Sequence, residues 1–433
     1  MKTFYIVFFL VPVFLYGQAV WTPPVIIEEI TVNALDKIVS YSDANGNHLV
    51  INSSGTITYY RLDIEGGLEM DVVIDNGCEY SNYTVAITAY QDELYIAYQK
   101  GIYIKVVKSV NGGDIWSFLT QKEMLNSICN GIDAIYDELG LHVVWAVKRD
   151  SDDFFETYYE RYRRENPDWE ANKHITDEGY TGGRPTIALS ENRIHVNYNI
   201  YSGYELGHNY YLSLFYPNRA RTRDFNFSRN EWETSLLVSI SEPTLPYPCE
   251  VELWANSAEK IIVHNGYLHV ISFVYVFPYP WTCGLSWLFI YDKRRPINSS
   301  IWESEIEISK YCGADDDMPA AISIGQKFNV ISTLPNTGLV HFQYSDNNWS
   351  EETYIAESGS SVTNFCLSAY SYSLYTFWIN ENNQIWYSRS AQNPVAPVKI
   401  NPISRYLNRE HSFFEFEPEV LLYSQQKTIE DKE

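Results

Sequence analysis

The chain has 433 residues, of which 45% are hydrophobic and 16% are aromatic, including 36 tyrosines. Its formal net charge of −24 excludes a nucleic-acid-binding protein, because phosphate groups require a basic face. Aromatic side chains favour pleated, half-buried surfaces, so this composition indicates an all-β protein. The length allows two or three domains, but the repeats described below run without a linker from about Trp21 to Ile400, which predicts one domain.

The N-terminus is typical of an exported protein. After Lys2, the apolar run from Phe4 to Leu15 is too short to cross a bilayer, and Gly17 and Ala19 follow at cleavage spacing. We predict a signal peptide over residues 1–19 and a secreted, extracellular protein. A buried strand or a membrane anchor is the alternative. No later stretch reaches membrane-spanning length, so we expect no membrane span.

One strand pattern recurs along the chain. Close copies occur at Leu141–Trp145, Ile194–Tyr198 and Leu268–Ser272, each with a histidine as its second residue, and looser copies at Leu94–Tyr98, Phe328–Ser332 and Leu374–Trp378. Repeats of roughly 40 to 50 residues built from four short strands are typical of a β-propeller. One such sheet cannot bury both of its faces until neighbouring sheets stack on it.

The next strand of each repeat gives the number of blades. It occurs seven times, at Thr56–Tyr60, Tyr103–Val107, Thr157–Arg161, Tyr210–Leu214, Ser286–Ile290, Leu339–Gln343 and Gln384–Ser388. Tryptophans open the outer strands, at Trp116, Trp169, Trp232, Trp302 and Trp349. The last repeat lacks this tryptophan, so we expect Trp21–Ile27 to supply its outer strand and close the ring. The sequence thus predicts a seven-bladed propeller over residues 20–403. Six blades, with the first segment outside the ring, is the alternative.

One turn carries a family signature. The segment Ser109–Trp116 resembles the Asp-box of the sialidase-like (BNR-repeat) β-propeller superfamily, and shorter relatives occur at Ser345–Trp349 and Ser388–Ser390. In such a turn the Asn111 side chain bonds backbone amides, Gly112 and Gly113 adopt positive φ, and Trp116 fills the edge of the sheet. The resemblance implies that the box lies opposite the active face, so it concerns the fold and not the chemistry.

A working sialidase of this superfamily would carry three arginines on that opposite face, with a Tyr/Glu nucleophile pair, an Asp acid/base and an Arg-Ile-Pro motif. The sequence has no Arg-Ile-Pro, and repeat position leaves only Arg149 and Arg184 on the face. Other arginines are expected at strand ends or turns of the other face, at Arg161, Arg163, Arg164, Arg193, Arg219, Arg221, Arg223 and Arg389. Two arginines cannot form the triad, so we expect no sialidase activity.

Carboxylates are abundant in the loops of the same face, at Asp150, Asp152, Asp153, Glu205, Glu250, Glu252, Asp315, Asp316, Asp317 and Glu381. A rim of this kind would repel an anionic sugar. It could still hold a catalytic pair, because two carboxyl groups at the right separation suffice for glycoside hydrolysis. The sequence does not choose which two, and acidic loops are also what an acidic protein has by default.

Aromatic residues give the candidate ligand contacts. The segment Tyr275–Trp281 is expected to form a loop between the second and third strands of the fifth blade, where a propeller displays ligand contacts. Tyrosine and tryptophan faces suit sugar rings or peptide side chains. Packing of this loop over its own blade is the alternative. The predicted binding set is Trp281, Tyr279, Tyr275, Tyr204, His208, Arg184 and Arg149.

No metal or cofactor is predicted. The run Asp315–Asp317 offers oxygen ligands for calcium but lacks the spacing of a calcium loop, so a solvated acidic turn is preferred. His142, His195 and His269 occupy one repeat position in three successive blades, roughly 10 Å apart at sheet-packing distance. We interpret them as structural residues and not as a zinc site.

Six cysteines in an exported chain suggest disulfides. Most lie near the connection that enters a new blade, so we expect Cys78 to pair with Cys129, and Cys283 to pair with Cys249 or Cys312. The repeat is lost beyond Ile400, and residues 404–433 are predicted to form a tail.

The sequence therefore predicts a secreted, monomeric, non-catalytic propeller that binds a glycan or a cell-surface protein. A glycoside hydrolase on the same fold is the alternative, and a purely structural secreted repeat protein is a third possibility, because a fold alone does not decide function.

Overall fold

The computed structural model describes residues 20–34, 36–79, 84–124, 128–148, 155–170, 173–177, 182–200, 219–238, 250–279, 287–312, 319–334, 338–345, 347–356 and 362–391. Side chains are described throughout these ranges except at residues 219, 250–259, 275–279, 287–288, 310–312, 334 and 391. In this part of the chain no helix is long and apolar enough to cross a membrane.

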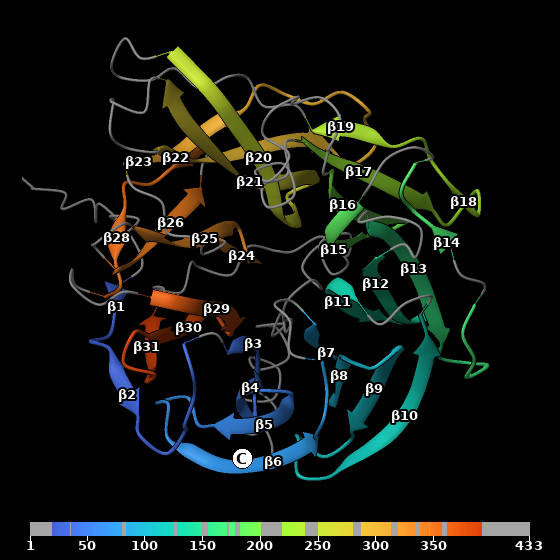
Figure 1. Cartoon of the computed structure of the whole chain (residues 1–433), viewed down its shortest axis with the longest axis vertical. Coiled ribbons are helices and arrows are strands. Elements are labelled where there is room, and N and C mark those ends of the chain that lie inside the picture. The colour runs from blue at the N-terminus through green and yellow to red at the C-terminus, as the bar shows by residue number, and fades with distance from the viewer. Residues whose placement is uncertain are drawn as a thin grey trace, which may run out of the picture.

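The described residues form seven antiparallel sheets arranged in a ring, which is the predicted seven-bladed propeller (Figure 1). The innermost strands are β3 (Lys37–Asp43), β7 (Val85–Tyr90), β11 (Cys129–Asp137), β15 (Gly182–Ser190), β20 (Glu250–His264), β24 (Ala320–Ile324) and β29 (Val362–Tyr370). The second strands are β4 (Gly46–Ser53), β8 (Glu93–Lys100), β12 (Gly140–Lys148), β16 (Arg193–Ile200), β21 (Tyr267–Tyr279), β25 (Lys327–Leu334) and β30 (Ser373–Asn380).

The third strands are β5 (Thr56–Leu62), β9 (Tyr103–Ser109), β13 (Phe155–Arg163), β17 (Arg219–Asn226), β22 (Trp287–Pro296), β26 (Gly338–Ser345) and β31 (Ile385–Ala391). The outer strands are β6 (Leu68–Asp75), β10 (Trp116–Glu123), β14 (Lys173–His174), β18 (Glu231–Trp232), β19 (Leu236–Val238), β23 (Ile306–Cys312), β27 (Asn348–Trp349) and β28 (Thr353–Tyr354). The last blade takes its outer strands β1 (Val20–Trp21) and β2 (Val25–Ile27) from the other end of the chain.

The strands differ in their pattern of buried and exposed residues according to their place in the blade. The second strand of the third blade, β12, is buried at every residue but its last, because neighbouring blades cover both of its faces. The outer strand β6 alternates between half-buried and exposed residues, as expected where one face meets solvent. Apolar clusters fill the layers between blades, for example around Trp145 between the second and third blades.

The ring is closed by the N-terminal strands, as predicted. Trp21 pairs with Ser390, and Ile27 pairs with Ile385, so both β1 and β2 extend the sheet of β31. This pairing covers an edge that would otherwise be free to pair with another chain. The six-bladed alternative is wrong, because the sheet of β3 to β6 is part of the ring (Figure 1).

The third strand of the fourth blade differs from the prediction. It is β17, which pairs with β16 from Arg193↔Asn226 to Ile200↔Arg219, whereas the predicted segment Tyr210–Leu214 lies outside the described residues. In β17 the buried Ala220, Thr222 and Asp224 alternate with half-buried arginines, a polar pattern that conceals its period of two. Arg221 and Arg223 therefore lie within a strand, and not at strand ends or turns as predicted, whereas Arg219 is the first residue of β17.

The fifth blade carries the longest hairpin. Strands β20 and β21 remain paired as far as Glu250↔Tyr279, beyond the last pairing of β21 with β22 at Val276↔Trp287. The predicted aromatic loop is therefore wrong as far as Tyr279, because the aromatic residues at every second position from Tyr275 to Tyr279 continue the strand.

The turn at Ser109–Trp116 has the hydrogen bonds and the positive φ values that its sequence predicts. The Ser109 hydroxyl accepts a hydrogen bond from the Gly113 N–H at 2.9 Å, and the Asn111 side chain accepts one from the Ile115 N–H at 3.0 Å. Gly112 and Gly113 have φ of 67° and 97°. Trp116 packs edge-on against Tyr59 of the preceding blade, with ring centroids 5.0 Å apart. The turn between β9 and β10 thus joins two blades.

The predicted disulfide between Cys78 and Cys129 is wrong, because both residues are buried thiols that form no disulfide. Cys78 packs between the first and second blades with Val85 and Ile87, whereas Cys129 packs between the second and third blades beside Trp145. Burial raises the pKa of the Cys78 thiol to about 11 and that of Cys129 to about 12, so both thiols stay protonated. The predicted pairing of Cys283 with Cys249 or Cys312 falls on side chains outside the described part of the chain.

Candidate functional site

The seven innermost strands surround a cavity of about 200 Å³ on the propeller axis. Each strand contributes lining residues, and most of these come from the half by which the chain enters the blade. Apolar residues such as Ile38, Ile87 and Phe365 form much of the wall. The cavity therefore belongs to the whole ring and not to one blade.

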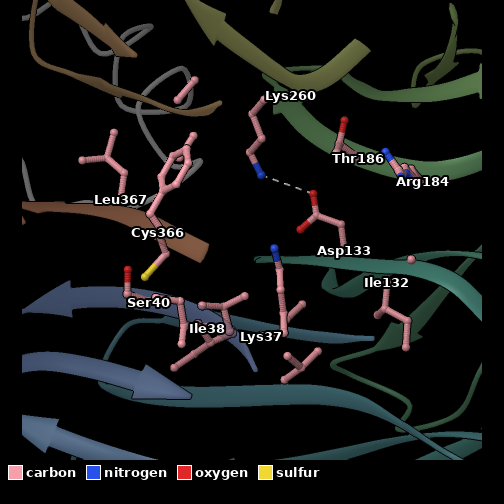
Figure 2. Close-up of a pocket in the computed structure, with 18 of the residues that line it drawn as sticks. Lys37, Ile38, Ser40, Ile132, Asp133, Arg184, Thr186, Lys260, Cys366 and Leu367 are labelled. Atoms are coloured by element: carbon pink, nitrogen blue, oxygen red, sulfur yellow. Dashed lines mark hydrogen bonds and ion pairs between the residues drawn. The ribbon is translucent and has the colours of Figure 1, made fainter. Parts of the chain in front are cut away.

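Charged residues from four blades line the cavity. Lys37 comes from β3, Asp133 from β11, Arg184 from β15 and Lys260 from β20. Figure 2 shows Lys37 and Lys260 pointing from opposite sides toward the Asp133 carboxylate. Among the described lining residues, cationic groups outnumber carboxylates by three to one, in a chain whose net charge is −24.

The Asp133 carboxylate is held in place by neighbours from two other blades. Its Oδ2 accepts a hydrogen bond from the Ile187 N–H at 3.1 Å and lies 3.5 Å from Lys260 Nζ. Its Oδ1 accepts a hydrogen bond from the following residue, Ala134, at 3.0 Å. A carboxylate engaged in this way is suited to positioning Lys260, and it is poorly suited to acting as a general base.

Irregularities in two strands bring the basic residues to the axis. The pairing of β15 with β16 shifts between Gly183 and Thr186, and Arg184 in this bulge has a φ of 47°. The pairing of β20 with β21 shifts between Ala258 and Lys260. β-Bulges redirect side chains, and positive φ at a residue other than glycine is a strained conformation that concentrates at functional sites.

A glycine in the next blade makes room for Arg184. Gly131 has a φ of 120°, and a Cβ added to it would lie 3.2 Å from the Arg184 Cα and 3.1 Å from the Pro185 Cδ. Any other residue would therefore be strained in its backbone and would press on the Arg184 segment. The placement of Arg184 depends on two blades together.

The cavity also contains a thiol. Cys366 on β29 is buried, and this burial raises its pKa to about 12, although hydrogen bonding with Ser40 and the charge of Lys37 act in the opposite direction. The thiol stays protonated near neutral pH and is a poor nucleophile.

Of the predicted binding residues, only Arg184 has a described side chain, and it lines the cavity. Tyr275 and Tyr279 lie on β21, where the backbone alone is described. The other four, Arg149, Tyr204, His208 and Trp281, lie outside the described residues. The same holds for the predicted carboxylates at 150, 152, 153, 205 and 315–317. Glu250 and Glu252 are on β20 without described side chains, and Glu381 is exposed in the turn before β31.

The sequence prediction missed Lys37, Asp133 and Lys260. A signal for two of them exists in the repeat itself. Asp133 stands two residues before Ile135, the partner of His142, and Lys260 stands two residues before Ile262, the partner of His269. Thr186 and Cys366 occupy the same position in their own blades. Aligning the first strands on the repeated histidine would have revealed this polar layer.

The repeated histidines are buried structural residues, as predicted. His195 is 2.9 Å from Asp224 through Nδ1 and 3.0 Å from the Ser190 hydroxyl through Nε2, which resembles a catalytic triad. All three residues are buried. In the first and third blades the position of Ser190 is occupied by Asp43 and Asp137, which bond His48 and His142. The arrangement is therefore a repeated structural pair and not a nucleophilic site.

His269 has the same kind of partner, with its Nδ1 3.0 Å from an Asp292 oxygen. In the part of the chain that the structure describes, no group of three or more His, Cys, Asp or Glu side chains could hold a metal ion.

No family model matches the chain, and no curated protein matches it in sequence. Many solved structures are similar to it, and three of them match most of its length as follows. The polysaccharide lyase Uly1 has a TM-score of 0.51 at 11% identity, over 82% of this chain and 90% of its own. A subtype N11 neuraminidase-like protein of A/flat-faced bat/Peru/033/2010 (H18N11) has a TM-score of 0.43 at 8% identity, covering 87% and 94%. YCF48 bound to D1 peptide has a TM-score of 0.44 at 11% identity, covering 85% and 96%. Identities this low show the β-propeller fold alone.

Proposed function

We propose that the chain is a secreted, non-catalytic binding propeller that recognises a glycan or a cell-surface protein on the face where its axial cavity opens. The observation that carries this proposal is the convergence of Lys37, Arg184 and Lys260 on one cavity, two of them from bulged strands. Strain and charge concentrated in one place favour a site selected for recognition.

The chemistry of the lining favours binding over glycoside hydrolysis. A glycosidase needs two carboxyl groups on either side of the scissile bond. Among the described residues that line the cavity, Asp133 is the one carboxylate, and its oxygens are engaged by Lys260 and by backbone N–H groups. A hydrolase using the predicted loop carboxylates is the alternative proposal. Release of reducing sugar from a panel of glycosides would support it.

Glycans are the ligands to test first. One structural neighbour is the polysaccharide lyase Uly1, which supports testing polysaccharides and other glycans before proteins. The predicted aromatic contacts Tyr275, Tyr279 and Trp281 would offer ring faces to sugars, and Tyr204, His208 and Arg149 are the further contacts that the sequence predicts.

The test is a glycan array probed with the mature protein and with Trp281→Ala. We expect the substitution to weaken binding by about 2 kcal/mol or more and to leave the melting temperature nearly unchanged, because aromatic anchors dominate interfaces. We also expect no release of sialic acid from sialosides. Unchanged binding together with a large fall in melting temperature would show that Trp281 is packing. Turnover of a sialoside that is abolished in Arg184→Ala would contradict the non-catalytic proposal.

A further inference from the structure

We infer that the group held in the axial cavity is a tetrahedral oxyanion of the sulfate or phosphate class, carried by the ligand or taken up as a free ion. This inference rests on the proposed function, because it names the chemistry that the same site recognises. It follows from the charge of the cavity, the directions of its donors and its size.

The charge of the lining favours an anion. Among the described residues that line the cavity, Lys37, Arg184 and Lys260 are cationic and Asp133 is the one carboxylate. The Lys260 and Asp133 side chains are only 19% and 15% exposed, which weakens the screening of their charges by solvent and salt. A site at which three cationic side chains meet one carboxylate attracts an anion.

The directions of the donors favour a tetrahedral anion over a carboxylate. A planar carboxylate is satisfied from one side by the fork of a single arginine. Here the cationic groups come from the first, fourth and fifth blades, and the hydroxyl-bearing residues Ser40 and Thr186 also line the cavity. Donors that surround an axis suit an anion whose oxygens point in several directions.

The size of the cavity limits what can enter it. A volume of about 200 Å³ is below the roughly 300 to 1,000 Å³ of pockets that enclose drug-sized ligands. The cavity therefore accepts one substituent of a larger ligand, or a free ion, and the rest of a glycan would lie on the face outside.

Substitution of Asp133 should change the affinity for an anion in a defined direction. Its carboxylate lies 3.5 Å from Lys260 Nζ and opposes an incoming anion while it holds that lysine in place. Asp133→Asn removes the negative charge and keeps an oxygen that can accept the Ile187 hydrogen bond. We therefore expect this variant to bind sulfate more tightly than the wild type.

The experiment is calorimetric titration of the whole mature protein with sodium sulfate and with sodium phosphate, at ionic strength held constant with sodium chloride. The wild type should bind one ion in a saturable manner. Lys260→Met should weaken this binding at least tenfold, and Asp133→Asn should strengthen it several-fold toward sulfate. Lys108→Met is the matched control. Lys108 lies on β9, is half-buried like Lys260, and has its Nζ 2.8 Å from Glu93 Oε1. This substitution should leave the affinity unchanged.

A second arm separates an ester group from a free ion. Glycans that differ only in one sulfate or phosphate ester are compared on the same array. Binding that requires the ester identifies a ligand-borne group. Saturable binding of the inorganic ion, with no preference among the glycans, identifies a free-ion site.

The inference is overturned if the wild type shows no saturable binding of either ion and binds glycans equally with and without the ester. In that case the proposed function would stand, because glycan binding itself would be intact. The titration of the wild type alone tests the inference, so the test does not depend on whether the variants fold.

Discussion

At the scale of single residues, buried polar groups are satisfied across blades. Arg295 of β22 is 1% exposed, and its guanidinium lies 2.8 and 2.7 Å from the two oxygens of Asp224 on β17. Burial raises the pKa of Asp224, but its hydrogen bonds and charge interactions with His195 and Arg295 outweigh this and hold the pKa well below its usual range. The histidine repeat was recognisable in the sequence. The carboxylate partners of these histidines were not recognisable, because strand register and packing between blades determine which carboxylate lies next to each histidine.

Two buried histidines predict how stability depends on pH. Burial lowers the pKa of both His264 and His341 to about 3 in the folded chain, against about 6.5 in an unfolded chain. The unfolded state therefore binds more protons between these two values, and stability is lost as the pH falls below about 6.5. We expect a slope of about 1.4 kcal/mol per pH unit for each histidine.

Urea denaturation at several pH values between 4 and 7 measures this slope. The depressed pKa values of Asp43, Asp137 and Asp224 act below the usual pKa of aspartate, about 3.9, and so outside this window. The variant His264→Gln/His341→Gln should have a flatter profile. An equally steep profile in this variant would contradict the assignment.

At the scale of elements, apolar and alternating runs identified most strands correctly. The exceptions have physical causes. β17 was missed because its buried residues are Ala220, Thr222 and Asp224, which are small or polar, and Tyr275–Tyr279 was assigned to a loop although its pattern favours a strand. The turn at Ser109–Trp116 was recognisable because its hydrogen bonds are local. Its contact with the preceding blade was not, since Tyr59 lies 57 residues before Trp116 in a different sheet.

Gly113 provides a test of that contact. Its φ is 97°, and an added Cβ would lie 1.9 Å from the Tyr59 hydroxyl oxygen. Gly77 has a φ of 67° with nothing within 4 Å of the added Cβ, so Gly77→Ala reports the backbone strain alone. We expect Gly113→Ala to lower the free energy of unfolding by at least about 2 kcal/mol more than Gly77→Ala. Equal losses in chemical denaturation would show that the turn does not depend on Tyr59.

At the scale of the whole molecule, the ring and its closure were predictable from the count of repeats and from the missing last tryptophan. The axial cavity was not. Its residues come from seven strands, and bulges at Arg184 and Lys260 that the sequence does not reveal bring the basic side chains together. Repeat position placed Arg184 on the candidate binding face. It did not single out Lys37, Asp133 and Lys260, because these residues lie in strands that were expected to be purely structural.

Closure of the ring by β2 can be tested with two substitutions in that strand. Ile27 is 3% exposed and packs in the cluster that joins the last and first blades, whereas Val25 on the same strand is 52% exposed. Ile27→Asp buries an unpaired charge and should destabilise the fold by about 3 kcal/mol or more. Val25→Asp should change stability by no more than about 0.5 kcal/mol. Similar melting temperatures for the two variants would contradict closure by this strand.

The most direct test of recognition by the axial cavity is the affinity of an array-selected glycan for the wild type, for Lys37→Met/Lys260→Met and for the control Lys108→Met. If the cavity holds the ligand, the double variant loses at least tenfold in affinity, the control binds like the wild type, and all three proteins have similar melting temperatures. Undiminished binding by the folded double variant would contradict recognition at the propeller axis.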